Sequence, residues 1–385
     1  MPIKRQQQQA GAGSNQYQVE GPLVVIDKAA ASEIANALGA MVAAQEFTAQ
    51  ASETADERIN RFDEKIIGEF SEKDLLKTFA DPQFQILLRK TQLHAASTGE
   101  DSDHDLLTKL LAERAQEPSR PMHSVVTRAV EVVEHIDPAA LRGMTFLWFA
   151  GTIGPHSPDP KAGLLAIDGL VAKLADGDLP TGTAWLQRLD MLNCIHYTPP
   201  GFQTMMKWHE IVLSSRPGYA CEGIQAADVA TVRFRLMSVA PNLGPLVVKH
   251  PFLSGCYRID ARSSTQLIET LTPGLQQLRQ ARDQIPRAAL NPLGDPPPLE
   301  KLGSIEELQA VLTEVRMDTV NAKAKANFIE FIESELPNLQ TMRSWWDGLP
   351  GAITLVPVGI AVAYSNAKRY DELGGLGSLS DMIGD

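Results

Sequence analysis

Cysteine and long apolar runs are both scarce in this chain of 385 residues. Three cysteines are too few for a disulfide framework. No apolar run reaches the roughly 20 residues that a membrane-spanning helix needs. The opening residues are charged, and glutamines follow them where a secretory signal would need an apolar stretch. These absences predict a cytoplasmic protein.

Positive charge is also in short supply. Lysine and arginine number 35 against 47 aspartate and glutamate residues, which leaves a net charge of −12. A protein that follows nucleic-acid phosphates normally presents a basic face, so nucleic acid is an unfavourable partner. The sequence also has no Walker-type phosphate loop, no nucleophile elbow and no H-E-x-x-H zinc motif. We therefore expect no enzyme activity, no cofactor and no resident metal.

Hydrophobic side chains recur with helical spacing near the start of the chain. Ile34, Leu38, Met41 and Val42 lie three or four residues apart, and the stripe resumes after a polar middle. This pattern predicts one long helix from about residue 28, or two helices broken near Ser52.

Capping signals divide the next segment into helices. Asp81, Asp137 and Asp159 each precede a proline, which places a side-chain acceptor just before the first helical residue. The predicted helices cover residues 71–79, 82–97, 102–116, 121–135, 138–151 and 160–175. Short loops between them favour antiparallel packing of neighbours.

The middle of the chain mixes patterns. Partial alternation of apolar residues with arginines predicts a strand over residues 229–239. Further short strands are expected at 246–249 and 256–259, between helices at 185–192 and 265–285.

The sequence as a whole predicts a mainly α fold that is α+β overall. The proline-rich residues 286–303 predict a linker, and Ser304 and Glu307 form a capping box directly after it. The expected parts are an arm at 1–27, a helical domain at 28–175, an α+β region at 176–285, the linker at 286–303 and a helical domain at 304–385.

The arm at residues 1–27 favours self-association. Its short β-like run cannot bury a hydrophobic face alone, so copies from several chains are expected to pair or stack. The long helix that follows adds an apolar stripe. The candidate residues for homo-oligomer contacts are Gln16, Gln18, Gly21, Val24, Ile34 and Leu38.

A second candidate surface lies near the end of the chain. Its aromatic and aliphatic residues are Trp345, Trp346, Leu355, Val358, Ile360 and Val362. Pro357 and Gly359 prevent one straight helix across them. The stretch from Gly351 to Tyr364 is expected to be a buried strand-turn-helix element packed against the helix at 304–336. The alternative is a segment that meets a membrane on activation.

The stretch from Ala29 to Ala51 is the other membrane candidate. It is rich in alanine but also carries polar residues, so its composition favours a protein interface over insertion.

Cysteine and histidine in the middle region raise the question of zinc. Cys194, His196, Cys221 and Cys256 have the chemistry of a closed Cys₃His site. The C-x-H pair is not the usual tight pair, and the remaining gaps are long. We predict buried thiols and no metal at these residues.

The most basic local set also lies in the middle region, namely Arg233, Arg235, Lys249, Arg258 and Arg262. On one sheet face these residues could bind a phosphate-containing ligand. A solvated strand face is the favoured interpretation.

Several segments resemble an uncharacterised family of bacterial proteins. These are the Gly/Asn/Ser…Gln…Gly opening at residues 11–21, the helical stretches at 81–88 and 97–114, and the closing L-x-x-V-G-I-A-x-A motif at 355–369. The similarity covers residues 11–150 and 340–369 best. Val356 stands where members usually carry threonine, which weakens a hydroxyl role there. The family is loosely associated with anti-phage defence, and it brings no catalytic residues.

This resemblance implies a non-enzymatic, homo-oligomeric defence effector or sensor that acts through protein–protein contacts. The expected partners are other copies of the chain, and possible further ones are a second defence protein or a phage component. Two alternatives stay open: an effector that perturbs membranes, and a ligand-gated binding module that uses the basic residues of the middle region.

Overall fold

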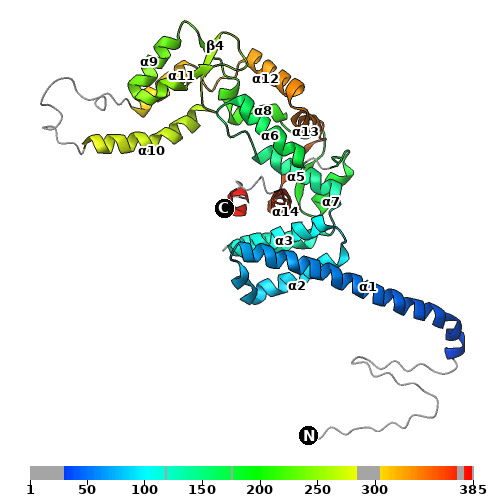
Figure 1. The fold of residues 1–385 in the computed structure, drawn as a ribbon. Coiled ribbons are helices and arrows are strands. Elements are labelled where there is room, and N and C mark those ends of the chain that lie inside the picture. Colours follow the sequence, from blue (N-terminus) through cyan, green and yellow to red (C-terminus); the bar gives the residue numbers. More distant parts are fainter. Residues whose placement is uncertain (1–29, 118, 175–176, 284–303, 371–376, 384–385) are drawn as a thin grey trace.

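The chain is mainly helical, with two small antiparallel sheets, which confirms the predicted fold class (Figure 1). This is a computed structural model. It describes residues 30–117, 119–174, 177–283, 304–370 and 377–383. The arm at 1–27 and the predicted linker at 286–303 lie outside the described residues.

The first half of the chain is a series of helices. Their bounds are α1 (Ala30–Glu72), η1 (Leu76–Ala80), α2 (Pro82–Ser97), α3 (Asp101–Gln116), α4 (Arg120–Val133), α5 (Pro138–Thr152) and α6 (Pro160–Leu174). The predicted Asp-Pro starts are confirmed, because Asp81, Asp137 and Asp159 each accept a hydrogen bond from a main-chain N–H of the helix that follows. The helix α1 runs unbroken past Ser52.

The second half alternates short helices and strands. The elements up to the predicted linker are α7 (Ala184–Met191), β1 (Ile195–Thr198), α8 (Trp208–Ser215), η2 (Pro217–Tyr219), β2 (Ile224–Gln225), α9 (Val229–Val239), η3 (Pro241–Leu246), β3 (Val247–Lys249), β4 (Cys256–Ile259) and α10 (Ser264–Asp283). After it come α11 (Ile305–Glu314), α12 (Ala322–Glu335), α13 (Pro337–Asp347), β5 (Ala352–Leu355), α14 (Pro357–Ala367) and α15 (Leu379–Ile383). The capping box of Ser304 and Glu307 opens α11 as predicted.

Two predictions of local structure are wrong. Residues 71–79 do not form one helix, because α1 ends at Glu72 and the 3₁₀ helix η1 begins at Leu76. Residues 229–239 form the helix α9 and not a strand. Val232, Leu236 and Val239 are buried, and their spacing of four and three residues belongs to a helix face. Phe234, which completes the alternation, is 74% exposed. The sequence contains both an alternating pattern and a helical one, and the residues that are buried follow the helical pattern.

The two sheets join distant parts of the chain. β1 pairs antiparallel with β5, with Ile195 opposite Leu355, so residues more than 150 positions apart share a ribbon. The other sheet has the order β2-β4-β3, with Val247 opposite Ile259.

Buried hydrophobic residues form two separate clusters. The main core is the larger and runs from Phe62 to Leu379, whereas the distal core lies between Ile224 and Met317. Figure 1 shows α9, α10 and α11 at one end of the molecule and α1, α2 and α3 at the other. The clusters do not follow the predicted boundary at residue 304, because α11 contributes to the distal core while α12, α13 and α14 contribute to the main core.

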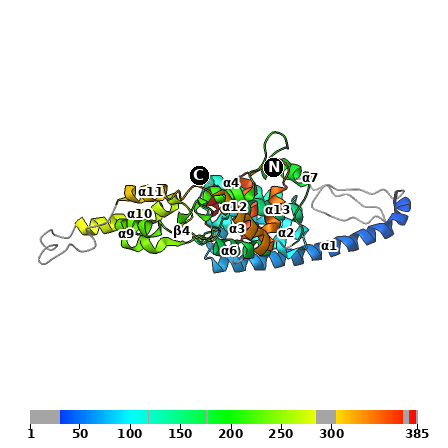
Figure 2. The ribbon, with the colours of Figure 1, turned by 90° about the horizontal axis from the view of Figure 1, so that it is seen from above.

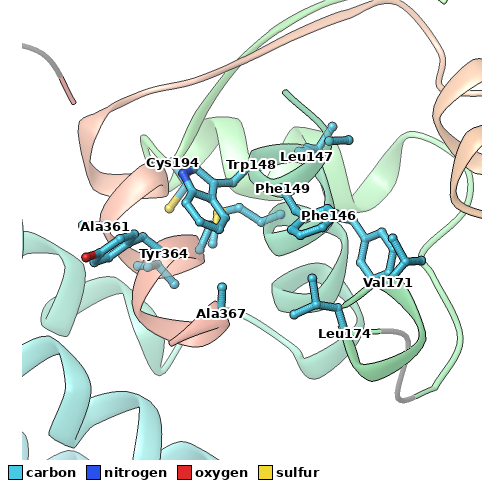
Figure 3. Close-up of a cluster of buried hydrophobic side chains, with 14 of the residues drawn as sticks. Phe146, Leu147, Trp148, Phe149, Val171, Leu174, Cys194, Ala361, Tyr364 and Ala367 are labelled. Carbon is cyan, nitrogen blue, oxygen red and sulfur yellow. The ribbon is translucent and has the colours of Figure 1, made fainter. Parts of the chain in front are cut away.

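The helix α14 lies at the centre of the main core, and its principal neighbours are α5, α4 and α3. Figure 3 shows Tyr364 close to Trp148, and the two rings meet edge to face with centroids 5.7 Å apart. Asn366 donates to the hydroxyl of Thr145 at 2.9 Å. The helix α14 therefore completes the first helical bundle and does not pack against residues 304–336 as expected, whereas α13, which carries Trp345 and Trp346, does contact α12.

Candidate functional site

The residues from Trp345 to Val362, which we call the closing segment, pack into the main core. Trp346 and Val362 are buried, while Trp345, Leu355, Val358 and Ile360 are half-buried. Both indole N–H groups donate to main-chain carbonyls: Trp345 to Pro180 at 2.9 Å and Trp346 to Met206 at 3.0 Å. Meeting a membrane with this segment would require the core to open. Among the described helices, none is long and apolar enough to cross a membrane.

Gly359 lets α14 approach the start of β1 very closely. A β-carbon at this position would overlap the carbonyl oxygen of Cys194. The same carbonyl accepts a hydrogen bond from the main-chain N–H of Val356 at 3.1 Å. A side chain at position 359 would therefore force β1 and α14 apart.

The candidate self-association residues fall in two places. Gln16, Gln18, Gly21 and Val24 lie outside the described residues. Ile34 and Leu38 belong to the first part of α1.

That part of α1 stands out from the body of the molecule in both views (Figures 1 and 2). The helix buries Phe62, Ile66 and Phe70 in the main core near its end, whereas residues 49–54 are all exposed. α1 is therefore anchored at one end and projects at the other.

The structure distributes the cysteine and histidine residues over different elements. Cys194 is buried in the main core, and burial raises the pKa of its thiol to about 11. His196 lies on β1 opposite Thr354, Cys221 forms an isolated bridge with Val320, and Cys256 begins β4. No group of three His, Cys, Asp or Glu side chains in the described part of the chain is placed to hold a metal ion.

The basic residues of the middle region do not share one sheet face. Arg233 and Arg235 lie on the helix α9, where Arg235 pairs with Glu314. Arg258 is 1% exposed and belongs to the interior. Neither the favoured solvated strand face nor the alternative phosphate site fits this arrangement, because these residues lie on a helix and in the interior.

Arg258 joins the two cores. Its guanidinium donates to the carbonyls of Gly218, Ile259 and Ala261 at 3.0–3.2 Å, and also to the carbonyl of Pro158 in the main body. Its charge is met by the Asp260 carboxylate at 2.8 Å. Burial lowers the pKa of Arg258, and Asp260 opposes that effect. Sequence reasoning placed this arginine on the surface and missed its structural role.

A groove lies where α8, η2, α10 and α12 meet, and we call it the junction groove. Its volume is about 790 Å³, and its lining residues are Met206, Glu210, Leu213, Ser214, Ser215, Pro217, Ser263, Thr265, Asp318, Val320 and Lys325. This size is within the range of small-molecule sites. Its lining comes from segments more than 100 residues apart, so no local sequence signal could have revealed it.

The charged groups of the junction groove and the hydroxyls of Ser214 and Ser215 already have partners. Lys325 pairs with Glu210 at 3.1 Å, and its hydrogen bond lowers the pKa of that carboxyl. Asp318 accepts from the main-chain N–H of Ser264 at 2.9 Å. The hydroxyls of Ser214 and Ser215 donate to main-chain carbonyls of their own helix. These groups are arranged to hold structure together, and a ligand would meet a mixed polar and apolar wall.

Comparison with known families places the chain in one of them. A family model described as ":-like" matches residues 27–289, more than half of the chain, so the chain belongs to that uncharacterised family. The match includes α1 to α10 and ends before α11. No curated protein and no solved structure matches the chain.

Proposed function

We propose that this protein is a non-enzymatic interaction protein that assembles with copies of itself through α1. Its setting, on this proposal, is the bacterial cytoplasm, where it serves as an effector or sensor in defence against phage. The observation that carries the proposal is the projection of α1 from the body of the molecule.

The geometry of α1 favours a second copy as the occupant of its projecting part. Residues 30–54 extend about 37 Å at 1.5 Å per residue. Helices in proteins gain most of their stability from packing an apolar face, and isolated helices are marginal in water. Apolar residues at helical spacing also occur before the polar middle of α1, at Ile34 and Leu38, as they do after it at Phe62 and Ile66. The same residues on another copy would cover Ile34 and Leu38.

Two further observations support an interaction role. The hydroxyls of Ser214 and Ser215 in the junction groove donate to main-chain carbonyls, which favours binding over nucleophilic chemistry at these two residues. The net charge of −12 favours a protein partner over nucleic acid. The link to defence rests on the resemblance of the opening, the helical core and the closing motif. A second defence protein or a phage component would be the further partner.

Plaque counts on bacteria that express the chain test this proposal. The double variant Ile34→Glu/Leu38→Glu places charge on the stripe of α1. Asn36→Glu is the matched control, because position 36 lies about 200° around the helix from position 34. We expect the wild-type chain and the control to lower plaque numbers and the double variant to lose this effect. Equal protection by the double variant would reject assembly through α1 as the basis of function.

Two alternative functions have their own readouts. The junction groove supports a ligand-binding module, for which mass spectrometry of the purified protein should detect a bound small molecule. A membrane effector would release dye from vesicles of anionic lipid. Val358→Asp would abolish that release without changing the melting temperature if residues 351–364 act outside the core.

A further inference from the structure

A second, smaller pocket lies between the start of α2, the end of α3 and the first turns of α4. Its volume is about 380 Å³. Its lining includes Arg114, Arg120, Arg128, His123, Ser124 and Thr127. It is separate from the junction groove and from α1, so the proposed assembly does not account for it.

Arg114 is the unusual member of this pocket. Its side chain is only 7% exposed, yet its one ion-pair partner among the described residues is Asp81, with 3.7 Å between the charged atoms. That distance is too long for a hydrogen bond. Asp81 is already occupied at its other oxygen, which accepts from the main-chain N–H of Gln83 at 2.9 Å. Burial lowers the pKa of Arg114.

No described group accepts a hydrogen bond from the Arg114 guanidinium, and Asp81 compensates its charge only from 3.7 Å. Arg114 lies in the last turn of α3, where the helix dipole favours a cation by about 0.3–1 kcal/mol. That contribution does not satisfy its five N–H donors. The pocket beside it is where an acceptor would fit.

The opposite wall of the pocket is one face of α4. Arg120, Ser124, Thr127 and Arg128 recur at spacings of four, three and one residues, which places them on the same side of the helix. The first turn of α4 contains no acidic residue, and its N-cap, Ser119, makes no side-chain capping bond. The positive end of this helix is therefore not compensated locally.

The charges around the pocket add up to an excess of positive charge. Arg128 shares Glu131 with Lys90, at 3.2 and 2.9 Å respectively. Among the described residues, Asp81 is the only acidic residue that forms an ion pair with Arg114. When Lys90, which lies outside the lining, is counted with Arg114, Arg120 and Arg128, four basic side chains surround two carboxylates, in a protein whose net charge is strongly negative.

We propose that this pocket binds the phosphate group of a small molecule. A phosphate dianion would match the local excess of two positive charges. Its oxygens would accept from the forked donors of Arg114 and Arg120, a geometry that guanidinium groups suit well. The volume leaves room for a substituent beyond the phosphate, whereas the acidic surface elsewhere disfavours a nucleic-acid chain.

Isothermal titration with pyrophosphate, inorganic phosphate and acetate in 0.15 M NaCl tests the site on the full chain. We expect pyrophosphate and phosphate to bind and acetate not to bind. Arg120→Gln should weaken pyrophosphate binding at least tenfold. Arg89→Gln is the matched control, because Arg89 is an exposed residue of α2 outside the pocket. It should bind pyrophosphate like the wild type.

Arg114→Gln gives a second readout. Saturating pyrophosphate should raise the melting temperature of the wild type and leave that of Arg114→Gln unchanged. If this variant fails to fold, Arg120→Gln still decides. Absence of pyrophosphate binding to the wild type would overturn the proposal, as would equal losses in Arg120→Gln and Arg89→Gln.

Discussion

Replacing Arg258 by methionine should destabilise the folded protein by about 3–5 kcal/mol. Arg258 lies on β4 of the distal sheet and donates to Pro158 and Gly218 outside that sheet. Methionine keeps much of the buried volume but supplies no donor. The loss therefore comes from carbonyls left without a hydrogen bond and not from a cavity.

The magnitude follows from the acceptors. The carbonyls of Gly218 and Ala261 are buried where they meet the guanidinium, and each orphaned acceptor costs about 1–3 kcal/mol. Ile259 loses less, because its carbonyl also accepts from the N–H of Ala261 at 2.8 Å. Asp260 is partly exposed and can regain water. These contributions together reach the range stated above.

Urea denaturation followed by tryptophan fluorescence measures the effect, and the melting temperature should fall by roughly 4–6 °C. Arg258→Lys keeps the charge but cannot reach all the carbonyls, so it should recover only a small part of the loss. Arg235→Met removes an exposed ion pair with Glu314 and should cost less than about 1 kcal/mol. Losses below 1 kcal/mol in both Arg258 variants would refute the role of Arg258 as the link between the cores.

Four further results are expected. Gly359→Ala should lower the free energy of unfolding in urea by at least about 3 kcal/mol, because the new β-carbon overlaps the main chain at the start of β1. The control Gly169→Ala has open space around its β-carbon and should raise the free energy of unfolding by up to about 1 kcal/mol. Similar values for the two variants would contradict the close approach. Trp346→Ala should cost about 3–5 kcal/mol, and an unchanged melting temperature would show that the closing segment is not core. Burial and then the charge of Arg258 hold the pKa of His250 at about 4, so the unfolded chain takes up a proton first as the pH falls. Stability should therefore drop by about 2 kcal/mol between pH 7 and 5 from this group, and a His250→Gln variant with the same pH dependence would exclude it. Elemental analysis of untagged protein should find no zinc; about one zinc per chain, lost on Cys221→Ser, would contradict this expectation.

Local signals in the sequence were sufficient for much of the secondary structure. Asp81 and Asp137 mark helix starts because their carboxylates meet main-chain donors two or three residues later. Pro357 separates β5 from α14 for a similarly local reason, since proline suits the first turn of a helix. Such features depend on a few neighbouring residues, so a single sequence is enough to predict them.

Contacts between distant segments could not be predicted in the same way. Asn366 meets Thr145 across 221 positions, and no periodicity indicates that pairing. The sequence predicted a surface position for Arg258 because its side chain is charged. Only the carbonyls that surround its guanidinium explain its burial. The helix α9 was missed because its sequence satisfies two periods, and packing chose between them. The same limitation applies to the junction groove and to the Arg114 pocket, whose walls come from separate elements.

Light scattering coupled to size-exclusion chromatography tests the central claim of assembly through α1 most directly. The chain has a mass of 41.9 kDa. We expect at least twice that mass for the full chain at micromolar concentration, and the mass of a single chain for Ile34→Glu/Leu38→Glu with an unchanged melting temperature. A measured mass of 41.9 kDa for the full chain would contradict assembly through α1.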